Sequence, residues 1–277
     1  MGSPKDSCAD SALWLGHRRP MLPRVTDFWA LLLAGIASGA LNSVGGGGTF
    51  VALPALVSAG LSPVTANASS TVALLPGALS SAWAYRGEIV PVGTTTNRSL
   101  TSVSLLGGGV GAGLLLALPA ATFDAAVPWL LAFATAVLAV GRPVSRLLRT
   151  TWGHPLDLGP RSVLAGQFVL AVYGGYFGGA VGIMMLALWS VGLGLDAAVG
   201  NPMRVAQLAA IYTPAAALFL IAGEVLADPI PLTAVLVGAL LGGYVGAHLA
   251  RRLPAPLLRA IVLTTAVTMT VLYFNRG

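Results

Sequence analysis

Four consecutive glycines, Gly45 to Gly48, are the feature of this sequence that most restricts its fold. They lie between two apolar runs, residues 28–44 and 50–61. Each glycine destabilises a helix by about 1 kcal/mol relative to alanine, so the sequence predicts that a helix breaks here. Both runs are too apolar for water, and inside a bilayer a broken backbone persists only where protein or a polar cavity satisfies its hydrogen bonds. Many transporters build their substrate sites from such breaks.

The composition indicates an integral membrane protein. Hydrophobic residues make up 56% of the 277 residues and charged residues only 9%, whereas soluble domains contain about 25% charged residues. The net charge of +6 does not indicate nucleic-acid binding, because the arginines cluster between apolar runs, as they do in cytoplasmic loops. The single cysteine, Cys8, excludes an internal disulfide framework and cannot form a metal site alone. We therefore expect no metal site and no cofactor.

The alternation of polar and apolar segments predicts an all-α, polytopic membrane helix bundle in the cell membrane. We divide the chain into a polar N-terminal tail (1–26), a first transmembrane repeat (27–141), an Arg-rich linker (142–161) and a second transmembrane repeat (162–277). A hydrocarbon core of ~30 Å needs about 20 helical residues. The predicted spans are 28–44 with 49–61, 68–85, 99–118, 125–141, 162–178 with 181–195, 203–222, 232–250 and 257–274.

The two halves match each other in order along the sequence. At a nearly constant offset, the matching segments are Gly60-Leu61 with Gly194-Leu195, Asn67 with Asn201, Gly87-Glu88 with Gly223-Glu224, and Val110-Gly111-Ala112 with Val245-Gly246-Ala247. Such matches predict an internal duplication in which Gly45 and Gly48 lie opposite Gly179 and Gly182. Paired helix breaks in corresponding halves point to a transport site at the interface between repeats.

Two topologies remain open at this stage. If each broken pair crosses the membrane once, the chain has about eight spans, and the positive-inside rule places the tail and the Arg-rich linker on one side. If the broken segments count as separate helices, there are about ten spans, the two halves are inverted, and the Arg-rich linker lies opposite the tail; the short segment 50–61 fits a half-helix in either topology. The distribution of arginines favours the first topology, although Arg251 and Arg252 then lie on the wrong side.

A specific motif follows the first glycine break. Its segments are Thr49-Phe50-Val51-Ala52-Leu53-Pro54, Gly60-Leu61-Ser62-Pro63 and Ala66-Asn67-Ala68-Ser69-Ser70. With the break, this motif resembles the TauE/SafE family of membrane transporters, and the resemblance covers residues 28–274. It implies a two-repeat plan and the export of sulfite, sulfoacetate or another organosulfonate. The second half departs from the motif, because Ala180 and Val181 lie opposite Gly46 and Gly47.

The glycine breaks are the first candidates for a binding site. A small oxyanion inside a membrane needs N–H groups, hydroxyls or amides, and helix N-termini supply N–H groups with a partial positive charge. We therefore predict substrate contacts at Gly45, Gly46, Gly47, Gly48, Thr49, Gly178 and Gly179. The alternative is that glycines only let helices pack closely. We assign that role to the pairs Gly35/Gly39, Gly107/Gly111 and Gly242/Gly246.

Polar residues beside the breaks are the second group of candidates. Asn67, Ser70 and Thr71 open the next apolar run, and Asn201 is the counterpart of Asn67. These residues are also favoured helix N-caps, so capping and substrate binding are both open. Pro202, which follows Asn201, fits the first turn of a helix.

Arg204 is the strongest single candidate, because charged residues at membrane depth are costly and usually functional. Its guanidinium could hold sulfite or a sulfonate through paired hydrogen bonds. The alternative is that the side chain extends to the lipid headgroups from a helix end. Gln207 lies on the same helical face and joins the predicted site.

These features favour a secondary transporter over an enzyme. A membrane-embedded enzyme, the first alternative, needs intramembrane acids, bases or metal ligands, and the predicted spans hold almost none. The second alternative is a non-transporting membrane protein, which would not explain a duplicated helix break. The expected partners are a small anionic substrate and the lipid bilayer, with no nucleic acid, and homo-oligomerisation is left open.

Overall fold

The computed structural model describes residues 25–152 and 157–249, together with residues 260, 263, 264, 266–268, 270 and 271. Within this part of the chain the fold is all-α, as predicted. The α-helices are α1 (Val25–Gly45), α2 (Thr49–Ser58), α3 (Pro63–Ala84), α4 (Asn97–Ala117), α5 (Ala120–Trp152), α6 (Pro160–Tyr176), α7 (Val181–Leu193), α8 (Ala197–Ala222) and α9 (Pro229–Leu249). Two 3₁₀ turns, η2 (Arg86–Glu88) and η3 (Glu224–Leu226), follow α3 and α8.

Several of these helices are suited to a bilayer. Among the described residues, five helices are long and apolar enough to cross a membrane, and they lie in α1, α4, α5, α8 and α9. The shorter helices α2 and α7 are also apolar and follow the two breaks. The prediction of a polytopic membrane helix bundle is therefore confirmed. The N-terminal tail, residues 1–24, lies outside the described residues.

Helix α3 begins earlier than the sequence suggested. Its N-cap is Ser62, whose Oγ accepts a hydrogen bond from the N–H of Thr65 at 3.2 Å, and Pro63 occupies the first turn. Asn67 and the polar residues after it therefore lie inside the helix, and the alternative that they cap it is wrong. The start signal is Ser followed by Pro, because serine is a favoured N-cap and proline a favoured first helical residue.

The same shift occurs in the second half. Helix α8 begins at Ala197, and its N-cap Asp196 accepts from the N–H of Ala198 at 2.8 Å. Asn201 and Pro202 thus lie inside α8, not at its start. Because α3 and α8 start early, Asn67 lies beside the C-terminal end of α6 and Asn201 beside that of α1.

Helix α5 extends through most of the segment expected to be an Arg-rich linker, because it continues to Trp152. The boundary between the two halves therefore lies between α5 and α6, where residues 153–156 fall outside the description.

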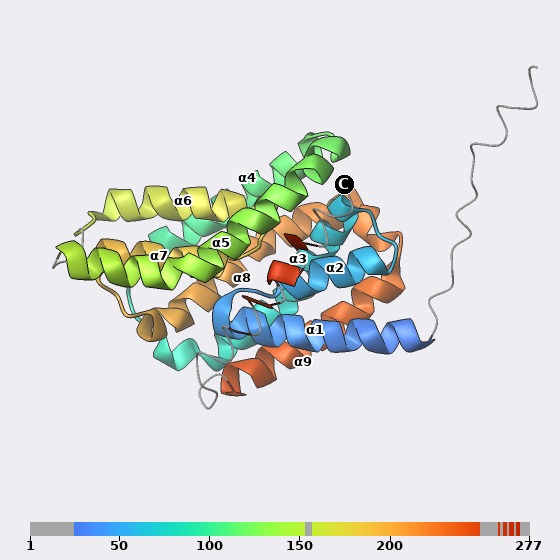
Figure 1. Cartoon of the computed structure of the whole chain (residues 1–277), viewed down its shortest axis with the longest axis horizontal. Helices are drawn as coiled ribbons and strands as arrows, with labels where there is room; N and C mark the ends of the chain where they lie inside the picture. Colours follow the sequence, from blue (N-terminus) through green and yellow to red (C-terminus); the bar gives the residue numbers. More distant parts are fainter. Residues whose placement is uncertain are drawn as a thin grey trace, which may run out of the picture.

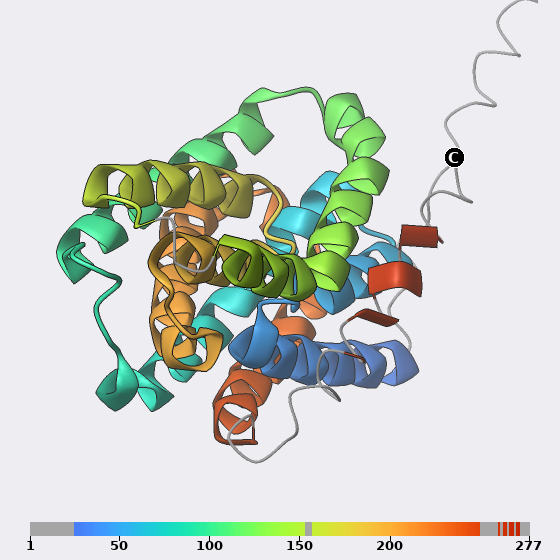
Figure 2. The same ribbon diagram turned by 60° about the vertical axis from the view of Figure 1, so that its left-hand side comes forward.

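The two halves interlock through close contacts between helices (Figures 1 and 2). Helix α1 packs along α9, and α4 packs along α6 and α8. A Cβ added to Gly39 would lie 2.2 Å from the carbonyl oxygen of Ala239, and one added to Gly111 would lie 2.0 Å from that of Val172. The predicted Gly-xxx-Gly packing is confirmed, because every one of these six glycines faces atoms of another helix at less than 3.0 Å.

Each half contains the same order of elements. A long helix, a break, a short helix, a long helix, a 3₁₀ turn and another long helix occur as α1 to α4 and again as α6 to α9. The packing is also exchanged, since the first helix of each half lies against the last of these helices in the other half. This arrangement is what a duplication would produce, and the duplication itself stays a prediction.

The short helices turn back along the broken ones. Helix α2 folds against α1, so that a Cβ on Gly48 would lie 2.6 Å from the carbonyl oxygen of Ser38. In Figure 1 the α1–α2 pair occupies the right-hand half of the molecule, and the α6–α7 pair occupies the left-hand half. The two helix pairs therefore reach the breaks from opposite ends of the long axis of the molecule.

Candidate functional site

Each break starts with a glycine in the left-handed region. Gly46 has φ 75° and Gly178 has φ 82°, a conformation that glycine adopts without strain. The N–H of Gly46 donates to the Leu41 carbonyl at 3.1 Å, and that of Gly178 donates to the Tyr173 carbonyl at 3.3 Å. The structural counterpart of Gly46 is thus Gly178, whereas the sequence offset placed Ala180 opposite it.

The two breaks meet each other. A Cβ on Gly46 would lie 3.0 Å from the Cα of Gly182, and a Cβ on Gly178 would lie 3.3 Å from Oγ1 of Thr49. The structure therefore brings together some predicted residues of both halves, Gly46 and Thr49 from the first and Gly178 from the second. Gly47 is buried, whereas a side chain at Gly45 would enter open space and Gly45 is only half-buried.

Two helix N-termini open onto this junction. The first intrahelical bonds are donated by Phe50 to the Gly47 carbonyl at 3.2 Å and by Ile183 to the Ala180 carbonyl at 2.9 Å. The N–H groups of the residues before Phe50 and Ile183 have no partner within their own helices. Because each N-terminus carries a partial positive charge, both favour a negative group in the break.

Arg204 is fully buried and reaches across to the other half. Its Nη1 donates to the Asn42 carbonyl at 3.0 Å, and its Nη2 donates to the Ser43 carbonyl at 2.8 Å. Its Nε donates to Oδ1 of Asn201 at 2.9 Å. The alternative that this side chain extends to the headgroups is wrong. The guanidinium instead caps the C-terminal end of α1, where a positive charge is favourable.

Asn67, in the first half, bonds to the end of the broken helix of the second half. Its Nδ2 donates at 2.9 Å to the carbonyl of Tyr176, the last residue of α6. Asn201, its counterpart, has its Nδ2 3.5 Å from the Ser43 carbonyl. Each asparagine therefore faces the end of the broken helix that belongs to the other half.

The remaining predicted residues make other contacts. Oγ of Ser70 and Oγ1 of Thr71 both donate to the Asn67 carbonyl, at 2.8 and 3.2 Å, so they bond within α3. Gln207 donates through Nε2 to Oγ1 of Thr101 at 3.1 Å. It is therefore directed toward α4 and away from the breaks. Gly179 lies beside the ring of Phe177, 2.5 Å from where its Cβ would be.

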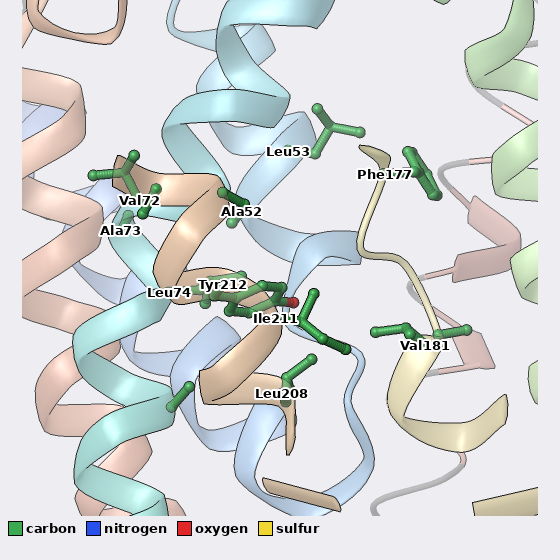
Figure 3. Close-up of a cluster of buried hydrophobic side chains, with 14 of the residues drawn as sticks. Ala52, Leu53, Val72, Ala73, Leu74, Phe177, Val181, Leu208, Ile211 and Tyr212 are labelled. Atoms are coloured by element: carbon green, nitrogen blue, oxygen red, sulfur yellow. The ribbon is translucent and has the colours of Figure 1, made fainter. Parts of the chain in front are cut away.

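Tyr212 is the main residue of the junction that the sequence reasoning missed. It is 1% exposed, and its hydroxyl lies 3.5 Å from the position of a Cβ on Gly178. In Figure 3 the side chain extends from α8 with its oxygen toward the segment that carries Phe177 and Val181. The signal was present, since Tyr212 lies two helical turns after Arg204 on the same face of α8.

The chemical groups at the junction are hydroxyls, amides, backbone N–H groups and one guanidinium. No group of three or more His, Cys, Asp or Glu side chains that could hold a metal ion occurs in the described part of the chain. Arg204 is also the one charged residue among the buried side chains described. The hydroxyls, amides and backbone N–H groups of the junction can donate hydrogen bonds to a small negative group.

Comparison with known proteins identifies the family. The model of the family described as sulfite exporter TauE/SafE matches residues 31–273, a range that contains both breaks and α2 to α9. No curated protein and no solved structure matches the chain. Because the match covers most of the sequence, the chain belongs to the sulfite exporter TauE/SafE family of membrane transporters.

Proposed function

We propose that this protein is a secondary transporter that exports a small anion across the cell membrane. The substrate class is sulfite, sulfoacetate or another organosulfonate, in line with the family description. The observation that carries the proposal is the meeting of the two breaks, where Gly46 contacts Gly182 beside the buried Arg204. The anion binds at this junction, between the two halves.

The electrostatics of the junction favour a negative ligand. The N-termini of α2 and α7 each contribute roughly half a positive charge. The C-terminal ends of α1 and α6 would oppose this effect, but Arg204 and Asn67 donate to their terminal carbonyls. The positive ends of the short helices are therefore left to act on the substrate.

The arrangement of the halves supports transport. The α1–α2 pair and the α6–α7 pair approach the junction from opposite ends of the molecule (Figure 1). Inverted halves with about ten segments of helix fit this arrangement better than eight spans, and discontinuous helices at a repeat interface are a common transporter design. A site at such a junction can open to either side of the membrane in turn.

The test is sulfite efflux from liposomes that contain the full chain. A Cβ at Gly182 would lie 2.7 Å from Nη1 of Arg204, so Gly182→Ala displaces the guanidinium from the junction. The matched control is Gly113→Ala, because a Cβ at Gly113 meets no atom within 4 Å. We expect efflux from wild type and Gly113→Ala, and little efflux from Gly182→Ala.

Two results would contradict the proposal at different levels. If wild-type liposomes release neither sulfite nor sulfoacetate faster than protein-free liposomes, transport of sulfur oxyanions is wrong. If Gly182→Ala transports like wild type, the family function stands but the site at the junction is wrong.

A further inference from the structure

Two buried tyrosine hydroxyls close to the breaks have no hydrogen-bond partner among the described residues. They belong to Tyr212 on α8 and Tyr173 on α6. The Tyr212 hydroxyl and Oγ1 of Thr49 lie 3.5 and 3.3 Å from the position of a Cβ on Gly178, but the hydroxyl has no partner in hydrogen-bonding geometry. Native proteins rarely leave buried polar groups unpaired, so each such group calls for an explanation, and a bound ligand is one.

We propose that the hydroxyls of Tyr212 and Tyr173 bind the oxygens of a sulfite or sulfonate group and select it over other anions. The proposal rests on the proposed function, because it assigns residues to the same junction. The two hydroxyls would donate to the anion in addition to the backbone N–H groups of the breaks. Neither tyrosine belonged to the site predicted from the sequence.

Both rings are held in place by packing. The Tyr173 ring packs edge-on against Phe133 and Phe177, each with ring centroids 6.0 Å apart. Tyr212 is enclosed by the buried apolar side chains of α3 and α8, including Leu74 and Leu208 (Figure 3). Donors fixed in this way need no reordering when a ligand arrives, which favours binding.

The arrangement of donors suits a head group with three oxygens. Oγ1 of Thr49 and the Tyr212 hydroxyl both lie near the position of a Cβ on Gly178, and the N–H of Gly178 donates to the Tyr173 carbonyl at 3.3 Å. Three residues that carry hydroxyls, from α2, α6 and α8, therefore meet at one junction. A sulfite or sulfonate group can accept from each of them, whereas a carboxylate has only two oxygens. Neutral donors also bind an anion without adding a second buried charge, which would be costly here.

The test compares Tyr→Phe variants of the purified full chain in detergent, with sulfite and sulfoacetate as probes and acetate as the control anion. In the absence of ligand, we expect Tyr212→Phe and Tyr173→Phe to unfold at or above the wild-type midpoint, since each loses an unpaired polar group. The Kd for sulfite should rise by about tenfold or more in each variant, because hydrogen bonds to charged groups are the strong ones. Binding of acetate, weak in wild type, should not change.

The matched control is Tyr85→Phe. The Tyr85 hydroxyl is also buried, but it donates to the Ala247 carbonyl at 3.1 Å. This variant should unfold at a lower temperature and bind sulfite as wild type does. It shows how losing a hydrogen-bonded hydroxyl affects stability and sulfite binding, for comparison with losing an unpaired hydroxyl.

Each outcome supports or overturns a specific statement. If wild type binds sulfite and the Tyr212 and Tyr173 variants bind it equally well, the selecting role is wrong and the proposed function is unaffected. If Tyr212→Phe lowers the midpoint as Tyr85→Phe does, its hydroxyl has a structural partner and the inference is overturned. If wild type binds no sulfur oxyanion, the proposed function itself fails.

Discussion

Replacing Arg204 with methionine tests whether this side chain holds the first break together. The change keeps an unbranched side chain and removes the guanidinium. The carbonyls of Asn42 and Ser43 then lose hydrogen bonds of 3.0 and 2.8 Å in a fully buried place. Each carbonyl keeps a second donor, the Gly46 N–H at 3.2 Å for Asn42 and Nδ2 of Asn201 at 3.5 Å for Ser43, so only the bonds to the charged group are lost. Hydrogen bonds to charged groups contribute about 1.5–3 kcal/mol each, so losing both should cost about 3–6 kcal/mol.

The measurement is thermal unfolding of the purified protein with no anion present, so that substrate binding has no effect on the result. A loss of 1 kcal/mol lowers Tm by about 2–4 °C in proteins of 150–250 residues. We therefore expect Arg204→Met to lower Tm by at least about 6 °C. Asn201→Ala is the matched control, because it removes the bond to Nε and the long 3.5 Å bond to the Ser43 carbonyl but leaves both carbonyls bonded to the guanidinium. Its cost should be about 1 kcal/mol.

The Tm of Arg204→Lys should lie between that of Arg204→Met and that of Asn201→Ala. A lysine keeps the positive charge at the end of α1 but lacks the planar fork that serves both carbonyls and Asn201. A Tm for Arg204→Met that equals wild type, or that falls no further than that of Asn201→Ala, would refute the capping role. The N–H of Gly46 and Nδ2 of Asn201 would then be sufficient donors for these carbonyls.

Two further predictions concern packing and topology. Gly111→Ala should destabilise the protein by about 1–3 kcal/mol, because its Cβ overlaps the α6 backbone, and chemical denaturation should show no such loss for Gly113→Ala. Inverted halves place the exposed N-caps Ser62 and Asp196 on opposite sides of the membrane. In a Cys8→Ala background, a membrane-impermeant maleimide added to intact cells should label only one of Ser62→Cys and Asp196→Cys, and equal labelling would indicate parallel halves.

Features that depend on local backbone properties could be predicted from the sequence. The glycines from Gly45 to Gly48 end α1 and permit the φ of 75° at Gly46. Gly111 lies at a close helix contact, as its spacing from Gly107 indicated. In both cases the absence of a side chain is itself the signal, so no knowledge of the neighbours is needed.

Helix boundaries were predicted less well, because two local signals compete at each start. The polar patch around Asn67 resembles an N-cap, but Ser62 followed by Pro63 begins the helix one turn earlier. This boundary affects the candidate site, since the earlier start places Asn67 opposite the end of α6. The sequence therefore identified the residue, but only the fold showed which carbonyl its side chain binds.

What the sequence alone determined is the class of protein, the place of the first helix break and the residues from which a binding site could be built. What only the tertiary structure decided is how those residues are paired. Arg204 binds backbone carbonyls 161 and 162 residues away, and Asn67 binds one 109 residues away. Every residue carries a backbone carbonyl. The sequence therefore cannot show which carbonyl will lie at the C-terminal end of a helix beside a buried side-chain donor. That choice follows from the exchange of helices between the two halves, which brings the breaks, Arg204 and Tyr212 to one place.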